Sequence, residues 1–172
     1  YINGITGASI KSLWRDSPGI DDTFQGCVYK NTADSITDVI LSNVYYELRV
    51  TNSVIEDVWF TSQSATNFHA RYLSSLKINV RIDLLLAIQS GNNNEIQIEI
   101  RKYDSTNTTF VSIDDFKMTS NGGTLGTRIE PISLASFTGL EQNERIRVFV
   151  RNVSGNTDIL TEPSSKIIIS KR

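Results

Sequence analysis

Histidine and cysteine, the side chains most often used for acid–base catalysis, nucleophilic attack and zinc binding, each occur once in this sequence. His69 lies in a stretch with strand periodicity, and Cys27 has no histidine close to it in the sequence. Zinc sites and serine or cysteine triads combine a histidine with other ligands or a nucleophile, so both kinds of site are disfavoured. We expect His69 to be structural or a pH-sensitive contact at an interface, and Cys27 to be a small buried side chain or an inert thiol.

Paired carboxylates are the next group that could do chemistry, because two acids can hydrolyse a glycosidic bond. The adjacent acidic pairs are Asp21-Asp22, Glu56-Asp57 and Asp114-Asp115. Adjacent residues of a strand point to opposite faces, so no pair forms a site by itself. The series Asp104, Ser105, Asn107 and Thr108 lacks the acidic density of a calcium loop, which disfavours calcium binding.

The glycine-rich segment Gly122-Gly123-Thr124-Leu125-Gly126-Thr127 has no lysine at the phosphate-loop position and no predicted helix after it. We interpret it as a flexible loop tip rather than a nucleotide site. The sequence thus assigns no catalytic, cofactor-binding or metal-binding residue, and we expect the protein not to be an enzyme.

Sugar binding needs only an exposed aromatic ring with amides or acids beside it. Trp59, Tyr72, Tyr103 and the tip Asn92-Asn93-Asn94 could supply these groups. The favoured alternative is that the aromatic rings belong to the core and that the asparagines form a turn.

Charge and length exclude several further classes. The 172 residues have a formal net charge of -2, from 17 basic and 19 acidic side chains, which disfavours nucleic-acid binding. The longest unbroken apolar run, residues 84–88, is too short to span a membrane. One cysteine allows no intrachain disulfide. The first residue is Tyr1 rather than methionine, so we expect a processed chain or a fragment.

The spacing of apolar residues then predicts the elements of the fold. Residues 1–30 are rich in glycine and small polar residues and are interpreted as an N-terminal arm or linker, followed by one domain over 31–172. Residues 76–89 have apolar side chains on one parity, which indicates a strand. Leu85 and Ala87 lie on the other parity, and they would be covered either within the sandwich or by a neighbouring subunit. Further strands are predicted at 36–41, 44–51, 68–73, 95–101, 110–118, 129–134, 145–151 and 166–170.

Residues 90–94 predict a turn that joins the strands 76–89 and 95–101 into a β-hairpin. In this hairpin Ile88 would face Ile96, Leu86 would face Ile98, Leu84 would face Ile100 and Asp83 would face Arg101. Residues 137–144 are predicted to form a loop. The resulting fold class is all-β, a two-sheet antiparallel jelly-roll sandwich of about eight to ten strands.

The strand–turn–strand region 77–103, with its tip Ser90-Gly91-Asn92-Asn93-Asn94, resembles the trimeric jelly-roll domains of bacteriophage fibres, spikes and head decorations. These domains are similar in shape to tumour necrosis factor and to complement globular heads. The order of parts over residues 28–172 also fits: an early tyrosine-rich strand, a long strand, the asparagine tip, a second strand, a variable loop, a bend at 139–144 and two final strands.

The resemblance implies a homotrimer in which one sheet of each protomer packs around a threefold axis. It also implies an N-terminal arm that contacts other virion proteins, and no cofactor. We therefore expect a virion structural protein that attaches to a glycan or protein of the host surface. The alternatives are a purely structural capsid or neck protein and a carbohydrate-binding module of a polysaccharide-degrading enzyme.

Overall fold

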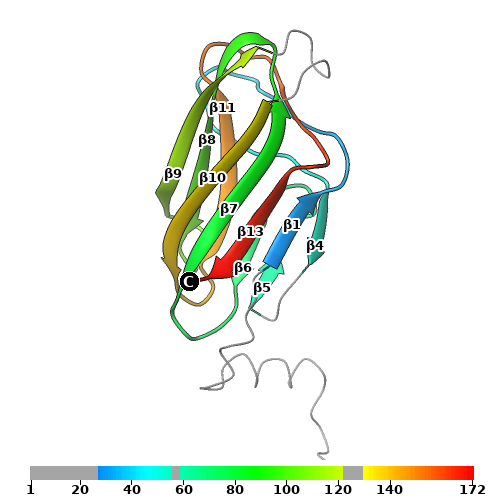
Figure 1. The fold of residues 1–172 in the computed structure, drawn as a ribbon. Coiled ribbons are helices and arrows are strands. Elements are labelled where there is room, and N and C mark those ends of the chain that lie inside the picture. Colours follow the sequence, from blue (N-terminus) through cyan, green and yellow to red (C-terminus); the bar gives the residue numbers. More distant parts are fainter. Residues whose placement is uncertain (1–26, 56–58, 122–129) are drawn as a thin grey trace, which may run out of the picture.

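The chain folds into an antiparallel β-sandwich (Figure 1), for which a computed structural model describes residues 27–55, 59–121 and 130–172. Within these residues there are thirteen strands and no helix, hence no helix able to cross a membrane. The predicted fold class is confirmed: two antiparallel sheets, one of seven strands and one of six, pack face to face.

The seven-stranded sheet consists of β1 (Cys27–Asn31), β2 (Ser35–Thr37), β4 (Asn52–Ile55), β7 (Ile78–Gln89), β10 (Glu130–Leu140), β12 (Ile159–Thr161) and β13 (Lys166–Lys171). The six-stranded sheet consists of β3 (Tyr46–Glu47), β5 (Phe60–Ser62), β6 (His69–Tyr72), β8 (Asn92–Tyr103), β9 (Phe110–Asn121) and β11 (Arg145–Asn152).

Each sheet is organised around one long strand. In the first, β7 pairs with β10 on one side and with β13 and then β12 on the other. In the second, β8 lies between β9 and β11, and β6 and β3 follow one another along the far side of β11. Figure 1 shows β10, β7 and β13 forming one layer, with β9, β8 and β11 forming the layer behind it.

The core lies between the two layers because each long strand turns alternate apolar side chains inward. Ile82 and Leu84 of β7 meet the inward side chains Ile98 and Ile100 of β8, and none of these four is exposed to solvent. Full burial of such a side chain contributes about 1.5–3 kcal/mol relative to exposure, so this strict alternation is the main stabilising feature of the fold.

The predicted hairpin between residues 76–89 and 95–101 is wrong, although both segments are strands. β7 and β8 belong to different sheets, and the chain crosses from one sheet to the other at Ser90 and Gly91, where Gly91 has φ +44°. Consequently Ile88 lies opposite Glu130 of β10 rather than Ile96. Alternation specifies which face of a strand is buried, and two such faces can meet across a sandwich as well as lie side by side.

Other predicted boundaries also shift. The predicted loop 137–144 is wrong in its first half, because β10 continues through Phe137 to Leu140, whose side chain is fully buried. The predicted strands 36–41 and 44–51 shorten to β2 and β3. Four short strands, β1, β4, β5 and β12, were not predicted, so the count exceeds eight to ten. Strands of three to five residues carry too few side chains to establish a period.

Several predictions fall wholly or partly outside the described residues. These are the arm over residues 1–26, the acidic pairs Asp21-Asp22 and Glu56-Asp57, and the glycine-rich tip at 122–127. The last residues of the predicted arm, 27–30, belong to β1, which pairs with β13 and β4.

Candidate functional site

The outer face of the six-stranded sheet carries arginine, aromatic and acidic side chains in register. Arg145, Arg147, Phe149 and Arg151 of β11 lie opposite Tyr103, Arg101, Glu99 and Gln97 of β8, respectively. These eight side chains, together with Tyr45, Glu47, His69, Arg71 and Phe110 from neighbouring segments, are called the arginine face below. Its residues come from segments far apart in the sequence, which only the sheet brings together.

Arg101 lies at the centre of the arginine face among three aromatic rings. Its guanidinium carbon is 4.1 Å from the ring centre of Phe149, 4.2 Å from that of Phe110 and 4.6 Å from that of Tyr45. Its Nε donates to Oε2 of Glu99 at 2.8 Å, and both side chains are about nine-tenths buried. Cation–π contacts of this kind contribute about 0.5–2 kcal/mol each, more where water is excluded.

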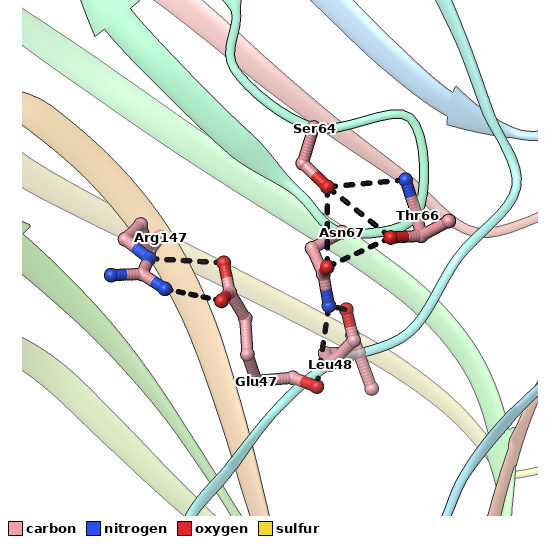
Figure 2. A network of polar contacts seen from close by, with 6 residues as sticks. All are labelled: Glu47, Leu48, Ser64, Thr66, Asn67 and Arg147. Carbon is pink, nitrogen blue, oxygen red and sulfur yellow. Dashed lines mark hydrogen bonds and ion pairs between the residues drawn. The ribbon is translucent and has the colours of Figure 1, made fainter.

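Arg147 is held by a bidentate ion pair with Glu47 of β3, which Figure 2 shows as two parallel contacts. Nε of Arg147 donates to Oε1 of Glu47 at 2.9 Å. This bond raises the pKa of the Arg147 guanidinium, which therefore stays charged. Arg151 lies 4.5 Å above the Tyr45 ring and donates to Gln97. Burial and the Glu99 carboxylate raise the pKa of Tyr45, so its hydroxyl stays protonated.

A polar turn before β6 fixes how that strand meets the arginine face. The Asn67 side chain donates to the carbonyl of Leu48 at 3.2 Å and accepts from the hydroxyls of Ser64 and Thr66 at 3.2 and 3.1 Å (Figure 2). With Asn67 anchored, the outward residues of the following strand are His69 and Arg71.

His69 is placed opposite Arg147, in a cationic environment. Burial, followed by the fields of Arg147, Arg145 and Arg71, lowers the pKa of His69 to about 4. Its Nε2 is buried without a hydrogen-bond partner. The imidazole is therefore neutral at pH 7, and no carboxylate in the described part of the chain orients it as a catalytic base.

A cleft of about 330 Å³ adjoins the arginine face beside Glu47, and its walls include Asp38, Ile40 and Arg49. A smaller cleft of about 170 Å³ shares Arg49 and includes Ile36. Among the described residues, the guanidinium of Arg49 and the carboxylate of Asp38 have no hydrogen bond or ion pair. These clefts could hold a small polar group, with one cation and one carboxylate free to bind it.

Of the three aromatic residues considered as sugar platforms, Trp59 and Tyr72 belong to the core, as the favoured interpretation expected, whereas Tyr103 lies in the arginine face. Trp59 and Tyr72 are 3% and 0% exposed and stack with their ring centres 6.2 Å apart. The third candidate, Tyr103, is 9% exposed and lies against Phe110 and Phe149. At the predicted asparagine tip, Asn94 Nδ2 contacts the hydroxyl of Ser90 at 3.5 Å.

The acidic candidates within the described residues are bound by other groups of the protein. Asp114 accepts from the Ser136 hydroxyl at 2.8 Å, whereas its neighbour Asp115 binds Gln97. The carboxylate of Asp104 accepts from the hydroxyls of Thr106 and Thr109, and these bonds hold its pKa well below the usual range. The described part of the chain contains no cluster of three or more His, Cys, Asp or Glu side chains able to hold a metal ion.

Sequence reasoning missed the arginine face. The signal was present in the alternation of basic and apolar residues over 145–151, and in the like parity of the charged residues in 95–101. Their position in the alternation predicts that these side chains point outward. Only the pairing of β11 with β8 shows that the outward side chains of the two strands lie opposite one another.

Comparison with known proteins finds similarity in structure only. No protein-family model matches the chain, and no curated protein matches it in sequence. Murine APRIL at pH 5.0 has a TM-score of 0.59 and 9% identity, over 86% of this chain and 99% of that one. Eiger TNF from S. frugiperda has a TM-score of 0.54 and 12% identity, over 87% and 92%.

A CocE/NonD family hydrolase from Staphylococcus aureus also matches, with a TM-score of 0.50 and 11% identity, over 87% of this chain but only 37% of the hydrolase. At such low identity the likeness concerns the fold alone. The chain therefore has a jelly-roll sandwich fold like that of the tumour necrosis factor proteins APRIL and Eiger.

Proposed function

We propose that this protein is a non-enzymatic structural protein of a bacteriophage virion, which assembles as a homotrimer and attaches the particle to the host surface. Within the virion it would be the head domain of a fibre, spike or decoration protein. The observation that carries the proposal is the difference between the two outer faces of the sandwich, one with a group of small and apolar side chains and one rich in arginine.

The outer face of the seven-stranded sheet provides the proposed subunit contact. Leu85 and Ala87 of β7 and Ile168 of β13 are only half-buried, and Ala135 and Phe137 of β10 are exposed. The sandwich itself thus leaves these side chains partly open to solvent, which favours the second of the two expected coverings, a neighbouring subunit. We call these five residues the assembly face. A flat face of small and apolar residues is typical of a sheet covered by a partner.

The arginine face lies on the opposite side of the sandwich, so assembly through the other sheet leaves it accessible. Three copies held together would bind a repetitive host surface with avidity, even where each individual contact is weak. This combination supports attachment rather than a purely architectural function in the capsid.

The test is the mass in solution of the wild type and of Leu85→Glu, measured by light scattering during size exclusion. We expect about 58 kDa for the wild type, three copies of 19.2 kDa, and one copy for the variant. Residue 85 lies between Ser133 and Lys166, so the new carboxylate can pair with Lys166 within the folded protomer. Asn79→Glu adds the same charge at the exposed end of β7 and should remain trimeric. A monomeric wild type would contradict the proposal.

A second candidate function rests on the match to part of the staphylococcal hydrolase. In this alternative the chain is a non-catalytic, carbohydrate-binding module of an enzyme. It predicts a monomer that binds defined glycans, so the same measurement of mass separates the two candidates.

A further inference from the structure

Arg71 and Arg145 lie directly opposite one another on β6 and β11, at the end of the arginine face. The next cross-strand pair on the same face consists of His69 and Arg147. Directly opposed residues of an antiparallel pair have Cβ atoms about 4.5–5.5 Å apart, so two like charges meet here at close range. Such an arrangement is unfavourable unless an anion lies between the charges.

Among the residues that the structure describes, no carboxylate forms an ion pair with Arg71 or Arg145. Both carboxylate oxygens of Glu47 are bound by Arg147. The Asp104 carboxylate is held by threonine hydroxyls, and only the main-chain carbonyl of Asp104 reaches Arg145. The field of the Asp104 carboxylate still acts on Arg145, but burial and Arg71 together lower the pKa of that guanidinium.

The guanidinium of Arg71 has hydrogen-bond donors without partners among the described residues. It makes no hydrogen bond or ion pair with any described residue, and its Nε is buried without a partner. The same holds for Nε2 of His69 beside it. A buried donor without a partner has lost its hydrogen bonds to water and has no protein partner to replace them. A ligand that accepts a hydrogen bond from such an atom would therefore gain binding free energy there.

We propose that Arg71 and Arg145 form a binding site for an oxyanion group carried by an acidic glycan. This inference rests on the proposed function, because it names the chemical class of the host-surface ligand. The planar fork of a guanidinium matches a carboxylate or sulfate with paired hydrogen bonds, and Arg71 would provide this fork. Arg145 Nη1 already donates to the main-chain carbonyls of Asp104, Ser105 and Asn143. Arg145 would therefore contribute its charge and its remaining donors from the opposite strand.

The surroundings favour a glycan over a protein partner. Protein interfaces are usually centred on exposed aromatic or aliphatic anchors. The large hydrophobic side chains that are exposed among the described residues lie on β2, β9, β10 and the segment 40–44, and none lies on β5, β6 or β11. The neighbour of Arg71 on β5 is instead Thr61, which is followed by Ser62. Hydroxyls beside a cationic pair suit a hydroxylated, anionic ligand.

His69 provides a built-in reporter for this site, because it is the single histidine of the chain. Its imidazole gives one set of NMR resonances, which will shift when an anion binds to Arg71 beside it. An anion there also stabilises the imidazolium, so the pKa of His69 should rise from about 4 toward its ordinary value. The charged groups facing it are Arg71 on β6, Arg145 and Arg147 on β11, and Glu47 on β3.

The experiment titrates the full chain with oligomers of glucuronic acid, with glucose oligomers of the same length and with sodium sulfate. Binding is followed by calorimetry and by the His69 resonances. We expect the acidic oligomer to bind the wild type, and Arg71→Gln to weaken this binding by about tenfold or more. Arg172→Gln is the matched control, because it removes one arginine charge beside Phe137 on the other sheet, and it should stay within about twofold of the wild type.

Three results would overturn the inference. Equal binding by the wild type and Arg71→Gln would exclude the site, and equal weakening by both variants would show diffuse attraction to positive charge. Binding of sulfate without binding of the acidic oligomer would exclude a glycan as the carrier. In each case a trimeric mass would leave the proposed function standing, whereas a monomeric wild type would remove that function without affecting the binding result.

Discussion

Two arginine–carboxylate pairs with the same spacing lie on the outer faces of the two sheets. On β7, Arg81 pairs with Asp83 at 2.7 Å, and their side chains are 51% and 24% exposed. On β8, Arg101 pairs with Glu99 at 2.5 Å, and their side chains are 11% and 9% exposed. The chemistry is the same, so the difference in burial comes from what surrounds each pair.

The neighbouring strands explain that difference. Arg81 lies opposite Phe137 of β10 and Ser170 of β13. The cation that lies over the Phe137 ring is Arg172, whose guanidinium carbon is 4.8 Å from the ring centre. Arg101 instead lies among three rings. The comparison shows that aromatic rings cover the Arg101–Glu99 pair on one outer face, whereas the Arg81–Asp83 pair on the other outer face stays partly exposed to solvent.

The largest expected effect is on the buried pair. Replacing Arg101 with Met should lower the free energy of unfolding by about 3 kcal/mol, because it leaves the Glu99 carboxylate buried and unpaired. Glu99 also lies opposite Asp115 of β9, so the loss of the cation leaves two like charges together. Urea denaturation followed by intrinsic fluorescence measures the change.

The double variant Glu99→Gln/Arg101→Met removes both charges and serves as the control. It should recover at least half of the loss, because no unpaired charge remains in the arginine face. If the double variant is as unstable as Arg101→Met, packing of the arginine between the rings dominates rather than the ion pair.

A smaller effect is expected from pH. The pKa of His69 is about 4 in the folded protein against 6.5 for an ordinary histidine, so between these values the unfolded chain binds the extra proton. Stability therefore falls as the pH falls from 6.5 through 4, and this contribution is absent above pH 6.5. Because the side chain is only partly buried, we expect about 1 kcal/mol in total.

His69→Gln cannot be protonated and tests the source of this pH dependence. The difference in unfolding free energy between wild type and variant should change by about 1 kcal/mol between pH 7 and pH 4.5, in favour of the variant at low pH. A constant difference would assign the acid sensitivity to carboxylates instead.

The smallest effect is expected from the exposed pair on β7. Arg81→Met should leave the denaturation midpoint within experimental error, because Arg81 is half exposed and solvent screens its contact with Asp83. A loss comparable to that of Arg101→Met would show that the two faces are equivalent, and would remove the distinction on which the proposed assembly rests.

Much of the architecture was predictable from local pattern. The alternation over residues 76–89 and 95–101 identified β7 and β8, the two long strands around which the sheets are organised. The candidate site was less accessible. Arg71 and Arg145 are 74 positions apart, and no residue near either one predicts that the two lie opposite each other.

The sequence by itself determined which side chains of each long strand face the core, because a period of two leaves no other way to bury the apolar set. Only the tertiary structure decided that β7 and β8 face each other across the sandwich, and that Arg71 meets Arg145 on the outer surface. Strand pairing depends on the burial and hydrogen bonding of the whole chain. These long-range contributions to stability do not change the periodicity of a single strand, so the periodicity cannot predict them.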